Sequence, residues 1–265
     1  MDIWGSQQLE DGQVYLAQIG PLGIYLRRLA DELHIAFERA NEYQTGSRIR
    51  EISTIQEYPN SVEWGRWIAG SDLEVVTLAP VMPDRPVVVR TELPLKIPTG
   101  QKALFFVSVP IWVRIVAGQA KLVTLCEATT VIRSNIWFGD TISGELCYSL
   151  LSRARRSADD FEIMPHRVIC PVTIANNSPT MLEIERFCVH VAHLNIYQGV
   201  RQLWTNEVNI AFRGESAYSK VDYANKEPDF EQIQKVLGKA RTPFKKTLLK
   251  ASLSGFKKLS GLRED

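Results

Sequence analysis

The fold class is decided by residues 103–117, which read ALFFVSVPIWVRIVA. Every odd position in this stretch carries an apolar side chain, and a period of two over fifteen residues predicts a strand with one face on a core. The alternation, with Arg114 inside it, is not typical of a membrane-spanning helix. Pro110 lacks a backbone N–H, so it predicts an edge position, a bulge, or a bend where the strand crosses between sheets.

Further strand-like segments, some with the same period, lie on both sides of this stretch. They are residues 86–93, 122–132, 168–174, 181–197 and 208–212. Turn residues separate them, at Pro98-Thr99-Gly100 and at Asn176-Asn177-Ser178-Pro179. Many short strands with regular turns predict a mainly β body over residues 1–222, an antiparallel β-sandwich or a barrel-like fold. The length of 265 residues fits one large all-β domain or two smaller ones.

Two segments can be assigned in two ways. Residues 22–43 alternate as a hairpin with its turn at Asp31-Glu32, but their apolar residues also follow helical spacing. We choose the hairpin, because the neighbouring segments are strands and helix propensity alone is a weak guide. Residues 145–156 are ambiguous in the same way, and they end in a cluster of arginines.

The net charge of +1 hides an asymmetry along the chain. Residues 235–263 contain nine Lys or Arg and no acidic residue, whereas residues 1–234 hold 22 basic and 28 acidic groups. The sequence therefore predicts an acidic body that carries a cationic C-terminal segment.

We predict that residues 223–265 form a basic, amphipathic helical tail. Pro228 fits a first helical turn with Phe230 and Ile233 on one side, and Thr242-Pro243 resembles a helix start. At 100° per residue, the following stretch separates an apolar face from a lysine face. The residues expected to bind a membrane or partner are Phe244, Leu248, Phe256, Leu259, Lys246, Lys250, Lys257 and Lys258.

Four roles are open to this tail. It could pack on its own body, lie on an anionic membrane surface, occupy a groove of a partner protein, or bind nucleic acid. Packing on its own body is the more common outcome for such a helix. Among the binding roles, anionic lipid contributes about 1 kcal/mol per nearby Lys or Arg, which supports a membrane surface. Nucleic acid is not expected, because the tail lacks interleaved aromatic residues and the acidic body would repel phosphate.

Several phrases of the sequence resemble one uncharacterised prokaryotic family. They are Trp4-Gly5, IGPLGIYL at residues 19–26, HRVICPVTIANNS at residues 166–178 and LWTNEVNIAFRGE at residues 203–215. Together they are similar to the domain of unknown function 432 family, over about residues 1–222. The resemblance implies no activity or catalytic residue. It does imply an accessory role near a membrane, because members are associated with genes for small mechanosensitive channels.

Searches for familiar chemistry find little. The sequence contains neither GxGxxG nor GxxxxGK[ST], neither G-x-S-x-G nor HExxH. The four cysteines form no CxxC pair, so we expect small core residues. Cys188 and His190 share a face of the predicted strand, and His193 would point away. Two ligands are too few for structural zinc, so no metal site and no cofactor are predicted.

A possible ligand surface consists of aromatic and arginine side chains. Its members are Trp64, Trp67, Trp137, Arg153, Arg155 and Arg156. The tryptophans could stack on a sugar or a base, and the arginines could hold a phosphate or a carboxylate. Packed aromatic residues and a solvated charged loop are the more common outcome for such residues.

These observations favour a non-enzymatic accessory or binding protein. We expect it to dock, through the C-terminal helix, on a membrane surface or on a membrane-associated partner such as a mechanosensitive channel. The N-terminus lacks a secretory pattern, so we expect a cytoplasmic protein, with a peripheral position at the inner membrane surface. The alternative is a β-sandwich that binds a small ligand or carbohydrate. A hydrolase is the third class, but the sequence offers no catalytic constellation for it.

Overall fold

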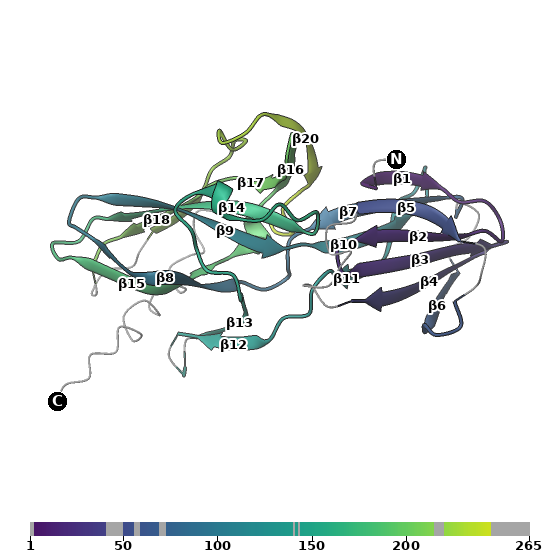
Figure 1. The fold of residues 1–265 in the computed structure, drawn as a ribbon, viewed down its shortest axis with the longest axis horizontal. Helices are drawn as coiled ribbons and strands as arrows, with labels where there is room; N and C mark the ends of the chain where they lie inside the picture. Colours follow the sequence, from purple (N-terminus) through teal and green to yellow (C-terminus); the bar gives the residue numbers. More distant parts are fainter. Residues whose placement is uncertain are drawn as a thin grey trace. The chain divides into compact units, whose positions relative to one another are not determined.

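A computed structural model describes residues 3–40, 50–55, 59–68, 73–139, 141–142, 144–214 and 220–244 (Figure 1). The chain forms two compact units that share the sequence in alternating pieces. Unit 1 consists of residues 1–81, 110–132 and 163–167, and unit 2 of residues 82–109, 133–162 and 168–265. Strands dominate both units, which confirms the mainly β prediction.

Unit 1 contains a five-stranded antiparallel sheet. In spatial order its strands are β5 (Arg50–Ile55), β2 (Val14–Ile19), β3 (Leu22–Leu29), β4 (Glu32–Arg39) and β6 (Trp64–Ile68). Strands β3 and β4 pair in register from Leu22↔Arg39 to Leu29↔Glu32, so the predicted hairpin is confirmed, but its turn is at Ala30-Asp31 and not at Asp31-Glu32. Ala30 at its turn has a φ of 50°, a left-handed conformation that suits a tight connection.

The second sheet of unit 1 has four antiparallel strands. They are β1 (Gly5–Gln8), β7 (Val75–Val81), β10 (Trp112–Ala117) and β11 (Val123–Thr129). In β10 the odd positions Val113 and Ile115 are fully buried, as the alternation predicts, and the side chains between them are partly exposed. Arg114 uses its exposed position to pair with Glu127 on β11 at 2.8 Å.

The long alternating stretch is divided at its proline. It forms β9 (Lys102–Pro110) and β10, and the chain leaves unit 2 after Val109 and enters unit 1 at Pro110. Strand β9 pairs with β14 of unit 2, whereas β10 pairs with β7 and β11 of unit 1. Of the three possibilities that Pro110 left open, the crossing between sheets is the correct one.

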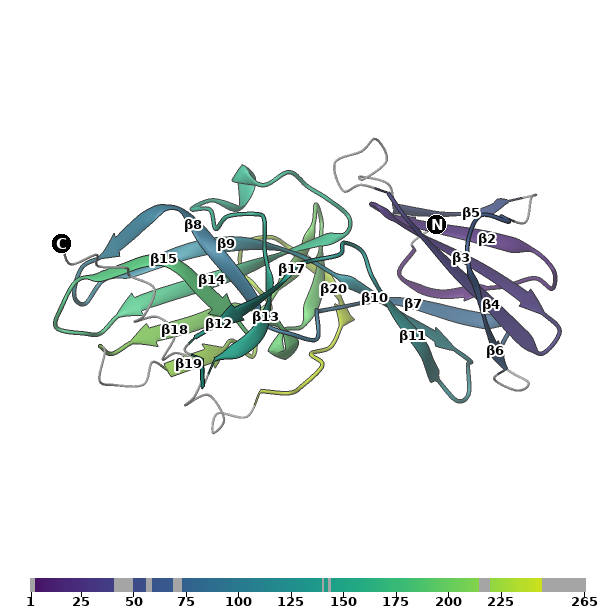
Figure 2. The same cartoon turned by 90° about the horizontal axis from the view of Figure 1, so that it is seen from below.

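Unit 2 also contains two sheets (Figure 2). The smaller has the strand order β12 (Asn135–Phe138), β13 (Glu145–Ser149), β8 (Val87–Ile97) and β15 (Leu182–Val189). Strands β12 and β13 form a hairpin, so the first part of the ambiguous segment 145–156 is a strand, which ends at Ser149. The parallel pairing of β13 with β8 is short, with Tyr148↔Val87 and Ser149↔Val88 in register.

The larger sheet of unit 2 has seven strands. Its order is β19 (Lys220–Tyr223), β18 (Val208–Phe212), β14 (Arg167–Asn176), β17 (Leu203–Thr205), β16 (Ile196–Gly199) and β20 (Ile233–Gly238), with β9 also on β14. Strand β14 is parallel to both β17 and β18, so the expectation of purely antiparallel sheets is wrong. Side-chain alternation is the same in parallel and antiparallel strands, and for that reason the sequence pattern missed the difference.

Two further predictions are corrected in this unit. Residues 181–197 do not form one strand: β15 ends at Val189, and a 3-10 turn, η2 (Val191–His193), precedes β16. Another short turn, η1 (Ala158–Asp160), is capped by Ser157. The helix expected from Pro228 is replaced by strand β20, because Ile233 and Lys235 pair with β16 at a free edge.

Among the described residues, no helix is long and apolar enough to cross a membrane.

The predicted turn at residues 176–179 is organised by one buried amide. Asn176 is fully buried, and its Nδ2 donates to the backbone oxygens of Ile97 and Thr180, both at 2.8 Å. Its Oδ1 accepts from the backbone N–H of Ser178 at 3.0 Å and from the Ser178 hydroxyl at 2.7 Å. The side chain thus makes four hydrogen bonds that hold the turn together from its buried side.

We expect Asn176→Ala to lower the free energy of unfolding by about 2 kcal/mol or more, because several buried polar groups lose their partner. Urea denaturation measures the loss. The neighbouring Asn177 has an exposed side chain, so Asn177→Ala is a matched control that should change the stability by less than about 0.5 kcal/mol. Equal midpoints for the two variants would refute the role given to Asn176.

Candidate functional site

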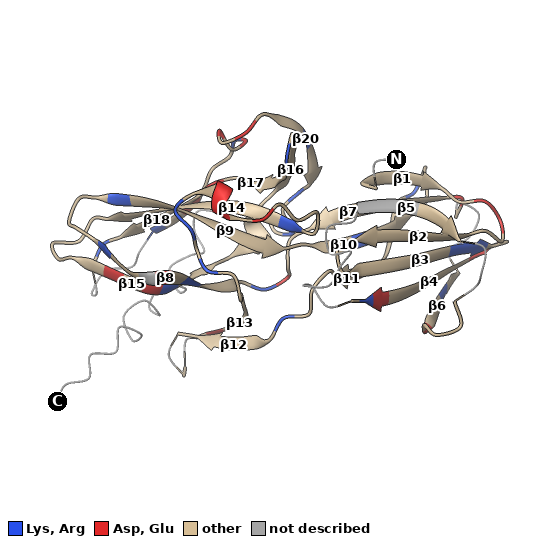
Figure 3. Cartoon of the chain, viewed as in Figure 1, with Lys and Arg blue, Asp and Glu red and all other residues tan. Residues whose placement is uncertain are grey.

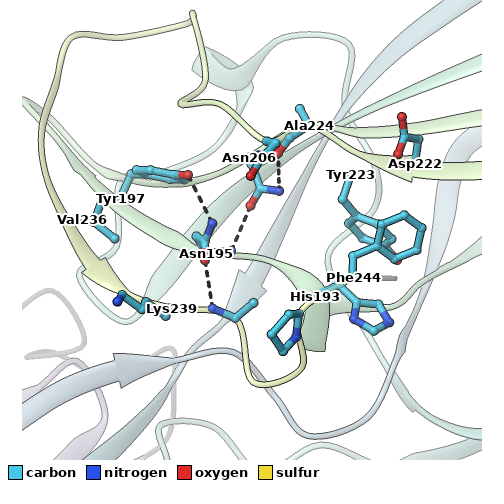
Figure 4. A pocket seen from close by; sticks show the side chains of 13 residues that line it. His193, Asn195, Tyr197, Asn206, Asp222, Tyr223, Ala224, Val236, Lys239 and Phe244 are labelled. Carbon is cyan, nitrogen blue, oxygen red and sulfur yellow. Dashed lines mark hydrogen bonds between the residues drawn. The ribbon is translucent and has the colours of Figure 1, made fainter. Parts of the chain in front are cut away.

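Unit 2 contains a cavity of about 820 Å³ beside its larger sheet (Figure 4). Its wall is formed by β16, β19, β20 and the segments that flank them. The lining residues are His193, Asn195, Tyr197, Asn206, Asp222, Tyr223, Ala224, Asn225, Val236, Lys239, Ala240, Pro243 and Phe244. This volume falls in the range of small-molecule sites, which combine apolar walls with a few placed polar groups.

Two asparagines hold the wall of the cavity together. The backbone N–H of Asn195 donates to Oδ1 of Asn206 at 2.9 Å, and Nδ2 of Asn206 donates to the backbone oxygen of Ala224 at 2.9 Å (Figure 4). Oδ1 of Asn195 accepts from the backbone N–H of Ala240 at 2.9 Å, and its Nδ2 lies 3.3 Å from the Tyr197 hydroxyl. These bonds fix the segment after β20 against the sheet, so the polar wall is preorganised.

Three rings form the apolar side of the cavity. The ring centroid of Phe244 lies 4.7 Å from that of Tyr223 and 5.6 Å from that of His193, and the Tyr223 and His193 centroids are 5.2 Å apart. The backbone oxygen of Thr242 lies 2.8 Å from Nδ1 of His193. Burial, with smaller contributions from nearby acidic groups, raises the pKa of the Tyr223 hydroxyl, so Tyr223 stays neutral.

Phe244 is the first residue of the predicted membrane-binding face, and here it packs on the body of unit 2. The other residues predicted for that surface, Lys246, Leu248, Lys250, Phe256, Lys257, Lys258 and Leu259, lie outside the described residues. Lys235 lies on β20, with Lys239 and Arg241 in the segment that follows it (Figure 3). Three of the nine basic residues therefore belong to the folded unit.

A second cluster of reactive groups lies between β13 and the end of β15. The Sγ atoms of Cys147 and Cys188 are 3.7 Å apart, and Glu145 Oε1 lies 3.9 Å from Cys188 Sγ. Nε2 of His190 lies 2.9 Å from Glu145 Oε1. Glu145, Cys147 and Cys188 each offer one ligand atom, and these three atoms lie within 4.8 Å of one another, so this group could hold a metal ion.

The cysteines differ in their surroundings. Burial raises the pKa of Cys126 to about 11 and that of Cys170 to about 12, so these two thiols are protonated and unreactive at neutral pH. A hydrogen bond to Cys147, together with burial, raises the pKa of the Cys188 thiol. The prediction of core cysteines is confirmed for Cys147, Cys170 and Cys188, which are buried, while Cys126 is half-buried.

The predicted ligand surface is divided between the two units. Trp64 and Trp67 are on β6 of unit 1, three residues apart and half-buried. The Trp64 indole donates to the backbone oxygen of Pro59 at 3.0 Å and packs on Tyr25, with ring centroids 6.1 Å apart. Trp67 covers Gly65, where an added Cβ would lie 2.5 Å from the indole. Both indoles thus contribute to packing in unit 1.

Trp137 and the arginines belong to unit 2. Trp137 is on β12 opposite Leu146, and it is 49% exposed. Arg155 pairs with the Glu92 carboxylate, and Arg153 donates to the Glu92 backbone oxygen at 2.9 Å. The Arg156 guanidinium donates to the Leu104 backbone oxygen at 2.7 Å. Each guanidinium therefore has a partner within the protein.

Comparison with known protein families decides where this chain belongs. The family model described as "Protein of unknown function (DUF432)" matches residues 3–257. The chain belongs to the DUF432 family. No curated protein and no solved structure matches it.

The family match changes one boundary that the sequence predicted. The resemblance was expected to end near residue 222, but the DUF432 region continues to residue 257. It therefore includes β20, the cavity wall around Phe244 and most of the cationic segment. The C-terminal segment up to residue 257 therefore lies within the region that the family model matches.

Sequence reasoning identified neither group of site residues in this DUF432 chain. The cavity residues come from η2, β16, the connection between β17 and β18, β19, β20 and the segment after it, and no local motif connects them. Residues that commonly bind metals do appear in the sequence as two short patterns, Glu145-x-Cys147 and Cys188-x-His190. In a strand, the two residues of each pattern would point to the same face. The expected separation of His190 and His193 was wrong, because η2 replaces the strand and leaves their rings 6.5 Å apart.

An ion-pair cluster lies on unit 1 beside Trp67. Glu32 of β4 accepts hydrogen bonds from Arg66 and lies 2.9 Å from Nε2 of His34. The hydrogen bonds from Arg66 and His34 lower the pKa of Glu32 from 4.5 to about 2. A carboxylate with a lowered pKa stabilises the fold above its ordinary pKa, and the contribution is lost as the pH falls toward the lowered value.

We therefore expect Glu32→Gln to melt at a lower temperature than the parent at neutral pH. The difference between the two melting temperatures should disappear as the pH falls from 4.5 to about 2. Thermal melts followed by circular dichroism across this range measure the gap. The exposed Glu63 is a suitable control, and Glu63→Gln should show no such closure. A gap for Glu32→Gln that does not change with pH would contradict the assignment.

Proposed function

We propose that this DUF432 member is a non-enzymatic binding protein whose cavity in unit 2 takes a small polar ligand that carries a ring, such as a sugar. The observation that supports the proposal is the cavity of about 820 Å³ with rings on one side and polar groups on the other. The sequence analysis gave a small-ligand-binding protein as its alternative and expected the tryptophans to contact the ligand. In this proposal the aromatic contacts come from His193, Tyr223 and Phe244 instead.

The chemistry of the wall favours such a ligand. The faces of Tyr223 and Phe244 would stack on a flat or puckered ring, a contact worth about 0.5–1.5 kcal/mol beyond its buried area. Asp222 and Lys239 offer an acceptor and a donor to hydroxyl or amide groups. The amides of Asn195 and Asn206 are used within the protein, so they would shape the site more than contact the ligand.

We expect Phe244→Ala to weaken ligand binding by about tenfold, because it removes one aromatic wall of the cavity. Saturation-transfer-difference NMR with a panel of monosaccharides and nucleosides would first identify a ligand for the full chain. Calorimetric titration of that ligand then compares the parent with the variant.

Phe230 is a matched control for this experiment. It belongs to the same unit and also packs on rings, with centroids 5.0 Å from Phe106 and 5.8 Å from Trp204, but it does not line the cavity. Phe230→Ala should leave the affinity unchanged. If no member of the panel binds, or if the two variants bind alike, the proposed ligand site is wrong.

A second proposal concerns the cationic segment after Phe244. We propose that residues 245–263, with six Lys or Arg and no acid, dock on an anionic membrane surface or on a membrane-associated partner such as a mechanosensitive channel. The charge distribution supports this role, since the rest of the chain is acidic and would be repelled by the same surface. Phe244 and Thr242 would anchor the base of the segment to unit 2.

We expect the full chain to float with vesicles that contain phosphatidylserine or phosphatidylglycerol, and binding should fall steeply with added salt. A chain that ends at Phe244 keeps every described residue and should remain in the unbound fraction. Neutral phosphatidylcholine vesicles are the lipid control. Equal flotation of the two chains would contradict membrane docking by this segment.

A further inference from the structure

The Glu145, Cys147, Cys188 and His190 side chains form a cluster that the proposed cavity does not use. We propose that Cys147, Cys188 and Glu145 bind a thiophilic divalent cation, of which Zn²⁺ is the representative, and that His190 positions Glu145. All four residues belong to unit 2.

Distances between the ligand atoms support the assignment. A tetrahedral zinc with Zn–S bonds of about 2.3 Å holds two sulfurs about 3.8 Å apart. The Cys147 and Cys188 sulfurs are 3.7 Å apart. They are too distant for a disulfide, whose S–S bond is about 2.05 Å. The same tetrahedron places a carboxylate oxygen about 3.6 Å from a sulfur, and Glu145 Oε1 lies 3.9 Å from Cys188 Sγ.

The nature of the ligand atoms indicates which cation the site would accept. Two sulfurs exclude Mg²⁺ and Ca²⁺ as preferred ions, because these hard cations take oxygen ligands. Thiolates with a carboxylate and a nearby imidazole suit Zn²⁺ and similar borderline or soft cations. Each thiol would release its proton to solvent on binding, so the affinity should rise with pH.

His190 has the geometry of a positioning residue. Its Nε2 lies 2.9 Å from Oε1 and 3.0 Å from Oε2 of Glu145, so the ring faces the carboxylate that would bind the cation. A partner of this kind fixes the orientation of a metal-binding carboxylate and raises affinity without touching the metal.

The surroundings of the cluster suit a stable site. Cys147 and Cys188 are buried, and Val88, Phe138 and Ile136 pack around them. Such an apolar shell keeps water from competing for the cation.

The cation would also connect two strands that lie on either side of β8, one of which the sheet holds weakly. Strand β13 is joined to β8 by two residue pairs, and Cys188 is on β15, the other neighbour of β8. A bond from Cys147 through the cation to Cys188 would therefore tie the β12–β13 hairpin to the rest of its sheet.

The experiment uses the full chain, reduced and freed of metal with a chelator. Titration with Zn²⁺ against a chromophoric chelator should show one tightly bound equivalent and a higher melting temperature. Co²⁺ in place of Zn²⁺ should give the charge-transfer absorption of cobalt bound to thiolate. The double variant Cys147→Ser, Cys188→Ser should lose the bound equivalent and the absorption.

Further variants separate binding from folding. Glu145 is partly exposed, so Glu145→Gln should fold and yet bind Zn²⁺ more weakly. His190→Ala should lower the affinity by about tenfold or more, whereas His190→Gln, which keeps a hydrogen-bond donor, should restore most of it. Cys126→Ser, in the other unit, is the control and should bind as the parent does.

Three results would overturn the proposal. The parent chain could fail to bind Zn²⁺ at micromolar concentrations, or bind it without the cobalt–thiolate absorption. The double cysteine variant could bind Zn²⁺ as tightly as the parent. Alternatively, mass spectrometry of the freshly purified protein could find Cys147 and Cys188 joined as a disulfide.

Discussion

The missing N–H of Pro110 is the constraint on which the architecture depends. Residues 103–117 are apolar at every second position, so they would otherwise continue as one strand in one core. A proline cannot donate to a neighbouring strand, and the ladder stops there. Strand β9 therefore remains in the larger sheet of unit 2, and β10 begins a new set of partners in unit 1. Both parts keep their buried odd positions, so one repeating pattern supplies two separate cores.

Local structure was largely predictable from the sequence. Strand patterns identified β8, β9, β10, β11, β14 and β18, the β3–β4 hairpin and the turn at Asn176, because each of these depends on neighbouring residues. Strands such as β1, β2 and β7 were not predicted. The prediction failed where a distant partner decides the outcome. Residues 233–238 have helical spacing, but the open edge of β16 offers backbone hydrogen bonds that a strand can use. Tertiary pairing then overrides a weak local preference.

The candidate binding residues of unit 2 were likewise not predictable from local sequence. The Cys188-x-His190 pattern is visible in the sequence, but two ligands alone are too few to predict a metal site. Glu145 and Cys147 supply the missing groups from a strand about forty residues earlier in the chain. Only the position of β8 between β13 and β15 brings them together. The cavity has the same origin, since Phe244 reaches Tyr223 and His193 only after β20 has paired with β16.

The alternating division of the chain has a consequence for protein synthesis. Unit 1 needs residues 110–132 and 163–167 as well as its first 81 residues, and unit 2 begins before unit 1 is complete. On the ribosome, the four-stranded sheet of unit 1 could not be completed until β10 and β11 emerge, and unit 1 as a whole would wait until residue 167. Such pairings between distant segments fold slowly and leave strand edges open to wrong partners. A nascent chain of this design would expose unpaired strand edges during synthesis, and neither unit is encoded by one contiguous gene segment.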